Sequence, residues 1–81
     1  MARVSGKHDS AGQLKRLGEA VRARRKSVGL SQEALADAAG IDRSHMGKIE
    51  RGERNLTLLN LLKIAAALDG LPSDLLREAD L

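Results

Sequence analysis

The side chains best suited to contact a polyanion lie in one stretch, RSHMGKIER at residues 43–51. In a helix, where successive residues turn by roughly 100°, Met46 and Ile49 would share one side. The opposite side would carry only cations and small residues: Arg43, Ser44, Gly47, Lys48 and Arg51. Arginine and lysine can donate to guanine O6 and N7, a serine hydroxyl can donate or accept, and glycine permits close approach. The pattern suits a helix in the DNA major groove, although an ordinary solvated helix can also show it.

No other stretch offers a site for catalysis or for a metal ion. The chain has no Cys, and its two histidines, His8 and His45, lack ligand spacing to any pair of carboxylates. No spacing or sharp-turn motif marks a nucleophile, and Gly47-Lys48 lacks the earlier glycine of a phosphate-binding loop. We therefore predict a protein that is not an enzyme and that needs no metal, no cofactor and no small-molecule ligand.

Composition narrows the class of protein further. A chain of 81 residues and 8.7 kDa forms one small domain. It has no Phe, Tyr or Trp, and so none of the aromatic platforms on which proteins stack single-stranded nucleic acid. The absence of Cys suits a reducing compartment, and no apolar run approaches the roughly 20 residues of a membrane span. These features predict a soluble, cytoplasmic protein without a membrane partner.

Charge is divided unevenly along the chain, whose net charge is +3. Residues 1–55 hold 12 of the 14 Lys and Arg residues and seven of the 11 acids, which leaves +5 there and −2 in residues 56–81. A clustered positive charge is the electrostatic footprint of nucleic-acid binding. The first two thirds of the chain are therefore predicted to face a polyanion, and the last third to do something else.

Hydrophobic spacing and capping residues predict five helices and no strand. Apolar residues recur at helical intervals, and each helix is expected to begin beside a side chain that accepts a hydrogen bond from a free backbone amide. These predicted caps are Ser10, Ser31, Asp42, Thr57 and Ser73. The fold class is therefore all-α.

The second and third predicted helices, at 31–39 and 42–51, are joined by a short turn that contains Gly40. Two short helices joined in this way are the sequence form of a helix-turn-helix. Residues 1–9 show no hydrophobic period and are predicted to be a flexible N-terminal arm. Residues 10–81 are predicted to form one domain for DNA binding and dimerisation.

The segment 57–68 has more apolar surface than one packing contact needs. One arc is expected in the core: Leu58, Leu61, Ile64, Ala65 and Leu68. A second apolar stripe of the same helix must be covered by another element. That element is either the last helix, folded back through Leu71, Leu75 and Leu76, or a second copy of the chain related by a twofold axis. We favour the dimer, with an interface made of Leu59, Leu62, Ala66, Leu71 and Leu75.

The segment 17–68 resembles the phage repressor and Cro-type helix-turn-helix family, also called XRE-like. The resemblance rests on LSQEALA at 30–36, Gly40-Ile41, IERG at 49–52 and LLKIA at 61–65. Within that family, DRS at 42–44 and IERGERNLT at 49–57 are most similar to the controller proteins of restriction–modification systems. The chain departs from them at His45, Gly47 and Lys48, all of which lie in the predicted reading helix.

The resemblance implies an all-α, five-helix, repressor-like domain and a role for several residues. Arg43, Ser44 and Lys48 would approach base edges. Backbone phosphates would be contacted by Gln32, Arg51, Arg54 and Asn55. Glu50 matches a position that forms a partly buried ion pair with an arginine of the first helix, here Arg25.

The expected function is that of a transcriptional regulator that binds double-stranded DNA as a homodimer on a near-palindromic operator and controls its own operon. In a bacterial or phage-type host it would be associated with the nucleoid. Two other functions stay open: an antitoxin or other protein-interaction module that binds DNA secondarily, and a coactivator-like adaptor without operator specificity. Co-purification of a second polypeptide would favour the first, and competition with bulk DNA would identify the second.

Overall fold

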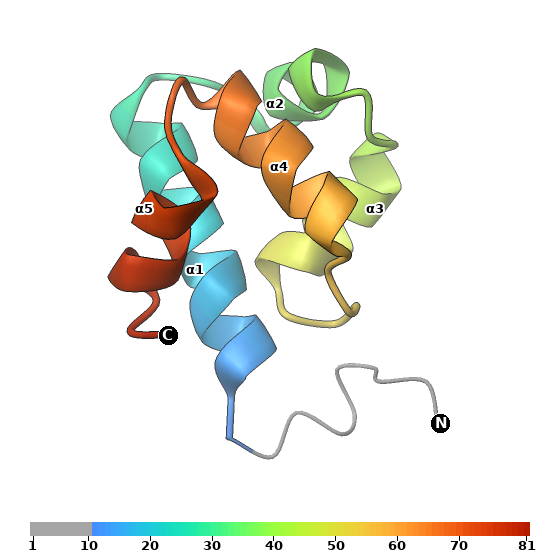
Figure 1. Ribbon diagram of the computed structural model, residues 1–81. Helices are drawn as coiled ribbons and strands as arrows, with labels where there is room; N and C mark the ends of the chain where they lie inside the picture. Colours follow the sequence, from blue (N-terminus) through green and yellow to red (C-terminus); the bar gives the residue numbers. More distant parts are fainter. Residues whose placement is uncertain (1–10) are drawn as a thin grey trace.

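The computed structural model describes residues 11–81, and five helices follow one another along this range (Figure 1). They are α1 (Gln13–Ser27), α2 (Gln32–Ala39), α3 (Arg43–Glu50), α4 (Leu58–Ala67) and α5 (Pro72–Glu78). The described residues contain no strand, so the predicted all-α, five-helix fold is confirmed. The predicted N-terminal arm at 1–9 lies outside them, as does Ser10.

Three helices begin at the predicted caps. The side chains of Ser31, Asp42 and Thr57 accept hydrogen bonds from the backbone amides three residues later, at 3.0, 3.2 and 3.1 Å. Each of these bonds satisfies one of the amides that the first turn of a helix leaves without a partner. The starts of α2, α3 and α4 are therefore fixed by local sequence.

The other two helices begin elsewhere than predicted. The residue that precedes α1 is Gly12, not Ser10. α5 begins at Pro72, one residue before the predicted cap Ser73, because the fixed φ of proline suits the first position of a helix and its missing amide costs nothing there. The carboxylate of Asp74 accepts from the amide of Leu71 at 3.0 Å and completes this start.

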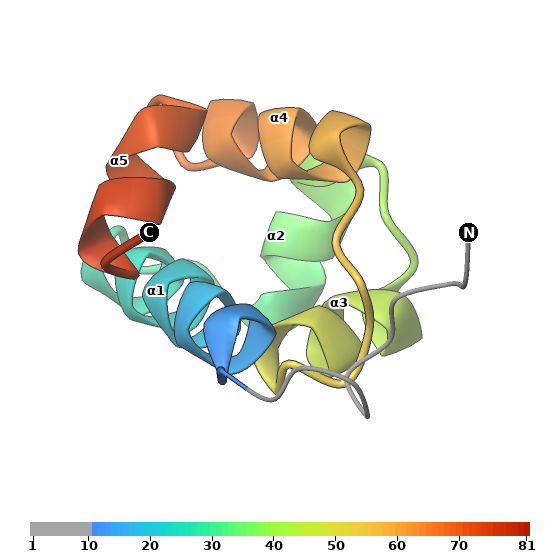
Figure 2. The ribbon, with the colours of Figure 1, turned by 60° about the horizontal axis from the view of Figure 1, so that its bottom comes forward.

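The core lies between all five helices, as Figure 2 shows by the way they surround one centre. Its largest fully buried side chains come from the first four helices and the residue that ends α4: Val21, Leu35, Met46, Ile64 and Leu68. α5 adds Leu75, and the residue that ends α5 adds Ala79. Leu58 was predicted in this core, but it is 70% exposed. Leu56, which precedes α4, packs against the core instead.

α1 and α3 approach each other closely at Gly18. A Cβ atom added there would lie 2.6 Å from the carbonyl oxygen of Glu50 and would also meet the carbonyl oxygen of Ile49. Both atoms belong to backbone, which cannot turn aside as a side chain can. The crossing of α1 over the end of α3 therefore requires glycine at this position.

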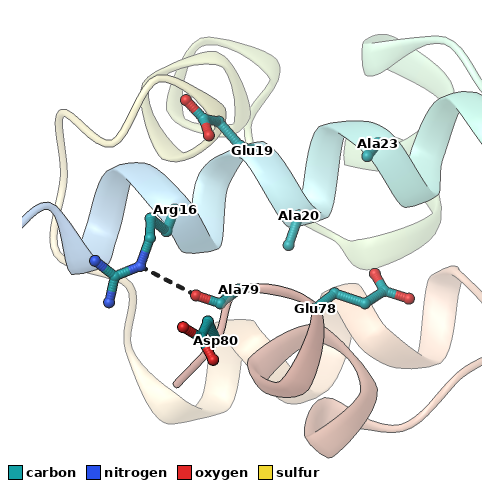
Figure 3. Close-up of a pocket in the computed structure, with 7 residues that line it drawn as sticks. All are labelled: Arg16, Glu19, Ala20, Ala23, Glu78, Ala79 and Asp80. Atoms are coloured by element: carbon teal, nitrogen blue, oxygen red, sulfur yellow. Dashed lines mark hydrogen bonds between the residues drawn. The ribbon is translucent and has the colours of Figure 1, made fainter.

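α5 is held along α1, on the other side of the molecule from α3 (Figures 1 and 2). Arg16 Nε donates to the carbonyl oxygen of Ala79 at 3.1 Å, and Arg24 Nη1 lies 3.3 Å from Glu78 Oε1. Figure 3 shows the open hollow between the two helices, with a volume of about 430 Å³ and Ala20 and Ala23 on its α1 side. α5 therefore packs away from α3 and does not cover its outer side.

Candidate nucleic-acid interface

The turn between α2 and α3 sets the position of α3. Gly40 ends α2 with a φ of 68°, a left-handed conformation that glycine adopts without strain. The amide of Ile41 then donates to the carbonyl oxygen of Ala36 at 2.9 Å, which closes the turn. Leu35 and Ile49 are buried as the two helices pack together. The result is a helix-turn-helix whose second helix lies at the periphery of the molecule (Figure 1).

α3 has one buried side and one open side. Met46 and Ile49 are buried, whereas Arg43 and Ser44 are exposed and Lys48 is half-buried. The three residues predicted to approach base edges are therefore together on one side of the helix and can be reached from solvent.

Gly47 also lies on this side, but it is buried rather than open. Two neighbouring side chains cover it: a Cβ atom added at Gly47 would lie 3.2 Å from Arg51 Nη1 and 3.3 Å from Gln32 Oε1. With these two residues, Arg43 and Ser44, it lines a shallow hollow of about 370 Å³. The prediction of glycine as an open point of close approach is corrected here, because long side chains occupy the space that glycine leaves.

Arg25 and Glu50 form a buried ion pair with two hydrogen bonds. Arg25 Nε donates to Glu50 Oε2 at 2.7 Å, and Arg25 Nη2 donates to Oε1 at 3.1 Å. Arg25 Nη1 donates to the carbonyl oxygen of Leu30 at 2.9 Å, at the end of the link between α1 and α2. The hydrogen bond to Glu50 raises the pKa of Arg25, so the guanidinium remains charged. One ion pair thus joins α1, α3 and the segment that leads into α2.

Gln32 extends this pair to the surface. Its Nε2 donates to Glu50 Oε1 at 3.2 Å, so that one of its two N–H bonds is already in use. The residue itself is half-buried at the N-terminus of α2, where backbone amides without helical partners favour an anion. Gln32 is therefore held in one orientation by a carboxylate behind it.

Arg51 is held in a similar way by Glu53, but at the surface. Arg51 Nε donates to Glu53 Oε2 at 2.7 Å and Nη2 donates to Oε1 at 3.3 Å. The hydrogen bond from Arg51 to Glu53 lowers the pKa of Glu53 and raises the pKa of Arg51. Arg54 and Asn55 follow in the same loop, and both are exposed. Of the four residues predicted to contact phosphates, Gln32 thus lies beside α3 in space, and the other three follow α3 along the chain.

A separate apolar surface lies over α4 and the start of α5. Leu59 is 61%, Leu62 44% and Leu71 63% exposed, and Ala66 is exposed as well. We call these four residues the leucine surface. Leu75, the fifth residue predicted in a dimer interface, does not belong to it, because its side chain is only 2% exposed and packs in the core of its own chain. Leu75 and Leu76 thus cover part of the core, but they leave the leucine surface open.

Residues 11–81 contain neither a metal-binding cluster nor a membrane-spanning helix. No three His, Cys, Asp or Glu side chains among them are grouped so that they could hold a metal ion. None of the five described helices is both long and apolar enough to cross a membrane.

Comparison with known families identifies the arrangement. The family model described as helix-turn-helix matches residues 21–76, from the middle of α1 to the middle of α5. The chain belongs to the helix-turn-helix family. The predicted resemblance is therefore confirmed.

Homologues of this helix-turn-helix chain are restriction–modification control proteins. Control protein C.SmaI of Serratia marcescens is 47% identical over 53 residues, which cover 65% of this chain and 63% of that protein. The crystal structure of the restriction-modification controller protein C.AhdI from Aeromonas hydrophila is 48% identical, with a TM-score of 0.78 over 79% of this chain and 97% of that one. The clp gene regulator ClgR from Corynebacterium glutamicum is 28% identical, with a TM-score of 0.81 over 84% and 88% of the two chains. The chain therefore spans less than two thirds of its curated relative C.SmaI.

Two side-chain contacts of the residues predicted to bind phosphates were not predicted from sequence. The first is the bond from Gln32 to Glu50, and the second is the pair of Arg51 with Glu53. The sequence signal for the second contact is the glycine between Arg51 and Glu53. Gly52 has a φ of 72°, and a left-handed glycine reverses the chain locally. The bond from Gln32 depends on how α2 meets the end of α3, which no local pattern reveals.

Proposed function

We propose that the protein is a transcriptional regulator that binds a specific sequence of double-stranded DNA as a homodimer and controls its own operon. The observation that carries the proposal is the open side of α3. It brings Arg43, Ser44 and Lys48 together at the periphery, and the buried side of the same helix is anchored by Met46 and Ile49. A rigid helix with short and cationic side chains on its outer side fits the major groove of B-DNA.

The contacts divide into two kinds. Arg43, Ser44 and Lys48 are proposed to read base edges, because they lie on the side of α3 that would enter the groove. Phosphate contacts are proposed for residues at the margins of that side: Gln32, Arg51, Arg54 and Asn55. Phosphate contacts place the protein on the duplex without reading sequence, whereas base contacts give specificity.

The leucine surface supports the homodimer. A second copy that met it across a twofold axis would cover Leu59, Leu62 and Leu71 of both protomers at once. This surface belongs to the acidic last third of the chain, which has less need to meet DNA. Two reading helices would then be about 34 Å apart, one turn of the duplex, so that the operator would be near-palindromic.

The physics of a small dimer would suit control of its own operon. Each protomer reads only a few base pairs, and joining two protomers makes operator occupancy depend steeply on protein concentration. A protein that regulates its own synthesis can use such a steep response as a switch. The names of its homologues, which are control proteins of restriction–modification systems, point to restriction and modification genes as the operon.

Selection of bound sequences from a random pool of duplexes tests the whole proposal. We expect enrichment of two inverted half-sites whose centres are about one helical turn apart. Recovery of sequences no different from the starting pool would contradict specific binding and would favour the coactivator-like adaptor.

Replacement of Arg43 separates base contacts from phosphate contacts. Arg43→Ala should reduce the discrimination between the selected duplex and a random one by roughly 1–3 kcal/mol per contact. Arg54→Ala is the matched control, which should weaken binding to both duplexes alike. Equal losses on both duplexes for Arg43→Ala would remove Arg43 from base readout.

A charge placed on the leucine surface tests the dimer. Leu62→Glu should convert the dimer into a monomer in sedimentation, because a carboxylate would be buried without a partner. Val28→Glu is a matched control, since Val28 is 46% and Leu62 44% exposed, and this variant should remain a dimer. An unchanged dimer for Leu62→Glu would place the interface elsewhere, and a second polypeptide that co-purifies would favour the antitoxin.

A further inference from the structure

The guanidinium of Arg51 faces two ways. Its Nε and Nη2 are bonded to the carboxylate of Glu53, at 2.7 and 3.3 Å. Its third nitrogen, Nη1, extends away from that carboxylate and over the backbone of α3 at Gly47. Glu53 therefore fixes the plane of the guanidinium, while Nη1 remains directed at the hollow of about 370 Å³ beside α3.

Gln32 approaches the same point from α2. Its Nε2 is bonded to Glu50, and its Oε1 lies over Gly47. A Cβ atom at Gly47 would be 3.3 Å from Oε1 of Gln32 and 3.2 Å from Nη1 of Arg51. These distances are shorter than ordinary van der Waals contact, so that a Cβ atom at position 47 would displace one or both groups by a few tenths of an ångström.

The fold by itself does not call for glycine at position 47. Gly47 lies inside α3, between Arg43 and Glu50, and its φ is not in the left-handed region that favours glycine. Glycine inside a helix weakens the helix relative to alanine. The three atoms nearest to the missing side chain, apart from the backbone of α3 itself, belong to the ends of Gln32 and Arg51. The glycine therefore makes room for these two side chains at a cost to helix stability.

We propose that Gly47 is a positioning residue of the DNA interface, which lets the side chains of Gln32 and Arg51 meet over α3 so that Arg51 Nη1 holds one backbone phosphate. This inference rests on the proposed function. Glu53 orients the guanidinium from one side, Glu50 orients the amide of Gln32 from the other, and Gly47 supplies the space in which both settle before DNA arrives. Arg51 then needs little rearrangement to bind the phosphate.

The test compares Gly47→Ala with the wild type in affinity, salt dependence and thermal unfolding. The probes are the duplex recovered by selection and a random-sequence duplex of the same length. Affinity for both duplexes should fall roughly three- to tenfold, and the slope of log K against log salt should become shallower by about 0.9 per protomer, the value for one phosphate contact. Tm should be unchanged or higher by up to about 6 °C, because alanine favours the helix.

The same substitution in an Arg51→Ala background is the control. If Gly47 acts through Arg51, the second substitution should change affinity less than twofold there, with no further change in the salt slope. The double variant also removes one of the two side chains that alanine would displace, so it keeps the comparison usable if the single variant folds poorly.

The outcomes distinguish this inference from the proposed function. If the wild type binds no duplex, the proposed function fails and this inference fails with it. If the wild type binds but Gly47→Ala binds with the same affinity and salt slope, this inference alone is overturned. A lower Tm for Gly47→Ala, or an equal loss of affinity in the Arg51→Ala background, would assign Gly47 to packing and would also overturn it.

Discussion

Two arginine–glutamate pairs flank the C-terminal end of α3, and they differ in burial rather than in geometry. In both, the arginine Nε lies 2.7 Å from the Oε2 of the glutamate. The side chains of Arg25 and Glu50 are 10% and 2% exposed, whereas those of Arg51 and Glu53 are 57% and 53% exposed. The same two functional groups therefore occur once inside the fold and once on its surface.

The difference in burial gives the two pairs different consequences. Removal of one partner from a buried pair leaves an uncompensated charge away from water, which is strongly unfavourable. An exposed pair is screened by solvent and adds little to stability. We infer that Arg25 and Glu50 hold α1, α2 and α3 together, whereas Glu53 serves mainly to orient Arg51.

The largest expected effect is the loss of the buried pair. Glu50→Ala leaves Arg25 buried without its carboxylate and releases Gln32, so the free energy of unfolding should fall by roughly 3–5 kcal/mol. Urea denaturation measures this change, with Glu53→Ala as the matched control at the exposed pair. A similar loss for both variants would erase the distinction between the two pairs.

A smaller effect is expected for the arginine of the exposed pair, and in DNA binding rather than in stability. Arg51→Ala should reduce affinity for the selected and the random duplex alike, by roughly tenfold, and should make the salt slope shallower by about 0.9 per protomer. Thermal unfolding should not change measurably. A loss confined to the selected duplex would mean that Arg51 reads bases instead of holding a phosphate.

The smallest expected effect is the titration of Glu53. Its hydrogen bond from Arg51 lowers its folded-state pKa below the ordinary value of 4.5. The pair therefore contributes stability that is present above the unfolded-state pKa and is lost as the pH falls through the folded-state pKa. An NMR titration of the Glu53 carboxyl group should show its midpoint rising toward the ordinary value in Arg51→Ala. The same midpoint in both proteins would show that the pair does not form in solution.

The sequence predicted the fold well wherever a local rule decides the structure. Ser31, Asp42 and Thr57 cap their helices because each needs only an amide three residues away. The separation of Met46 from Arg43 across α3 follows from helical periodicity alone. The pairing of Arg25 with Glu50 joins residues 25 positions apart, and only the resemblance to a known family suggested it.

Sequence reasoning failed where several segments meet. Leu58 fits the apolar arc of α4, yet it is exposed, and Leu56 of the preceding segment packs against the core. Leu75 was placed in the dimer interface, but the way α5 lies against α1 and α4 turns it inward. The cover over Gly47 depends on side chains from α2 and from the residue after α3. Periodicity describes one helix at a time and does not contain these contacts.

The close approach at Gly18 has a consequence for the evolution of this chain. Because a Cβ atom there would meet two carbonyl oxygens of the neighbouring backbone, no rotamer change can relieve the collision. In a library that randomises every position and retains only folded clones, codon diversity at this site should collapse to glycine, while neighbouring solvent-facing codons stay varied. An alternative residue could be fixed there only together with changes that move α1 and α3 apart.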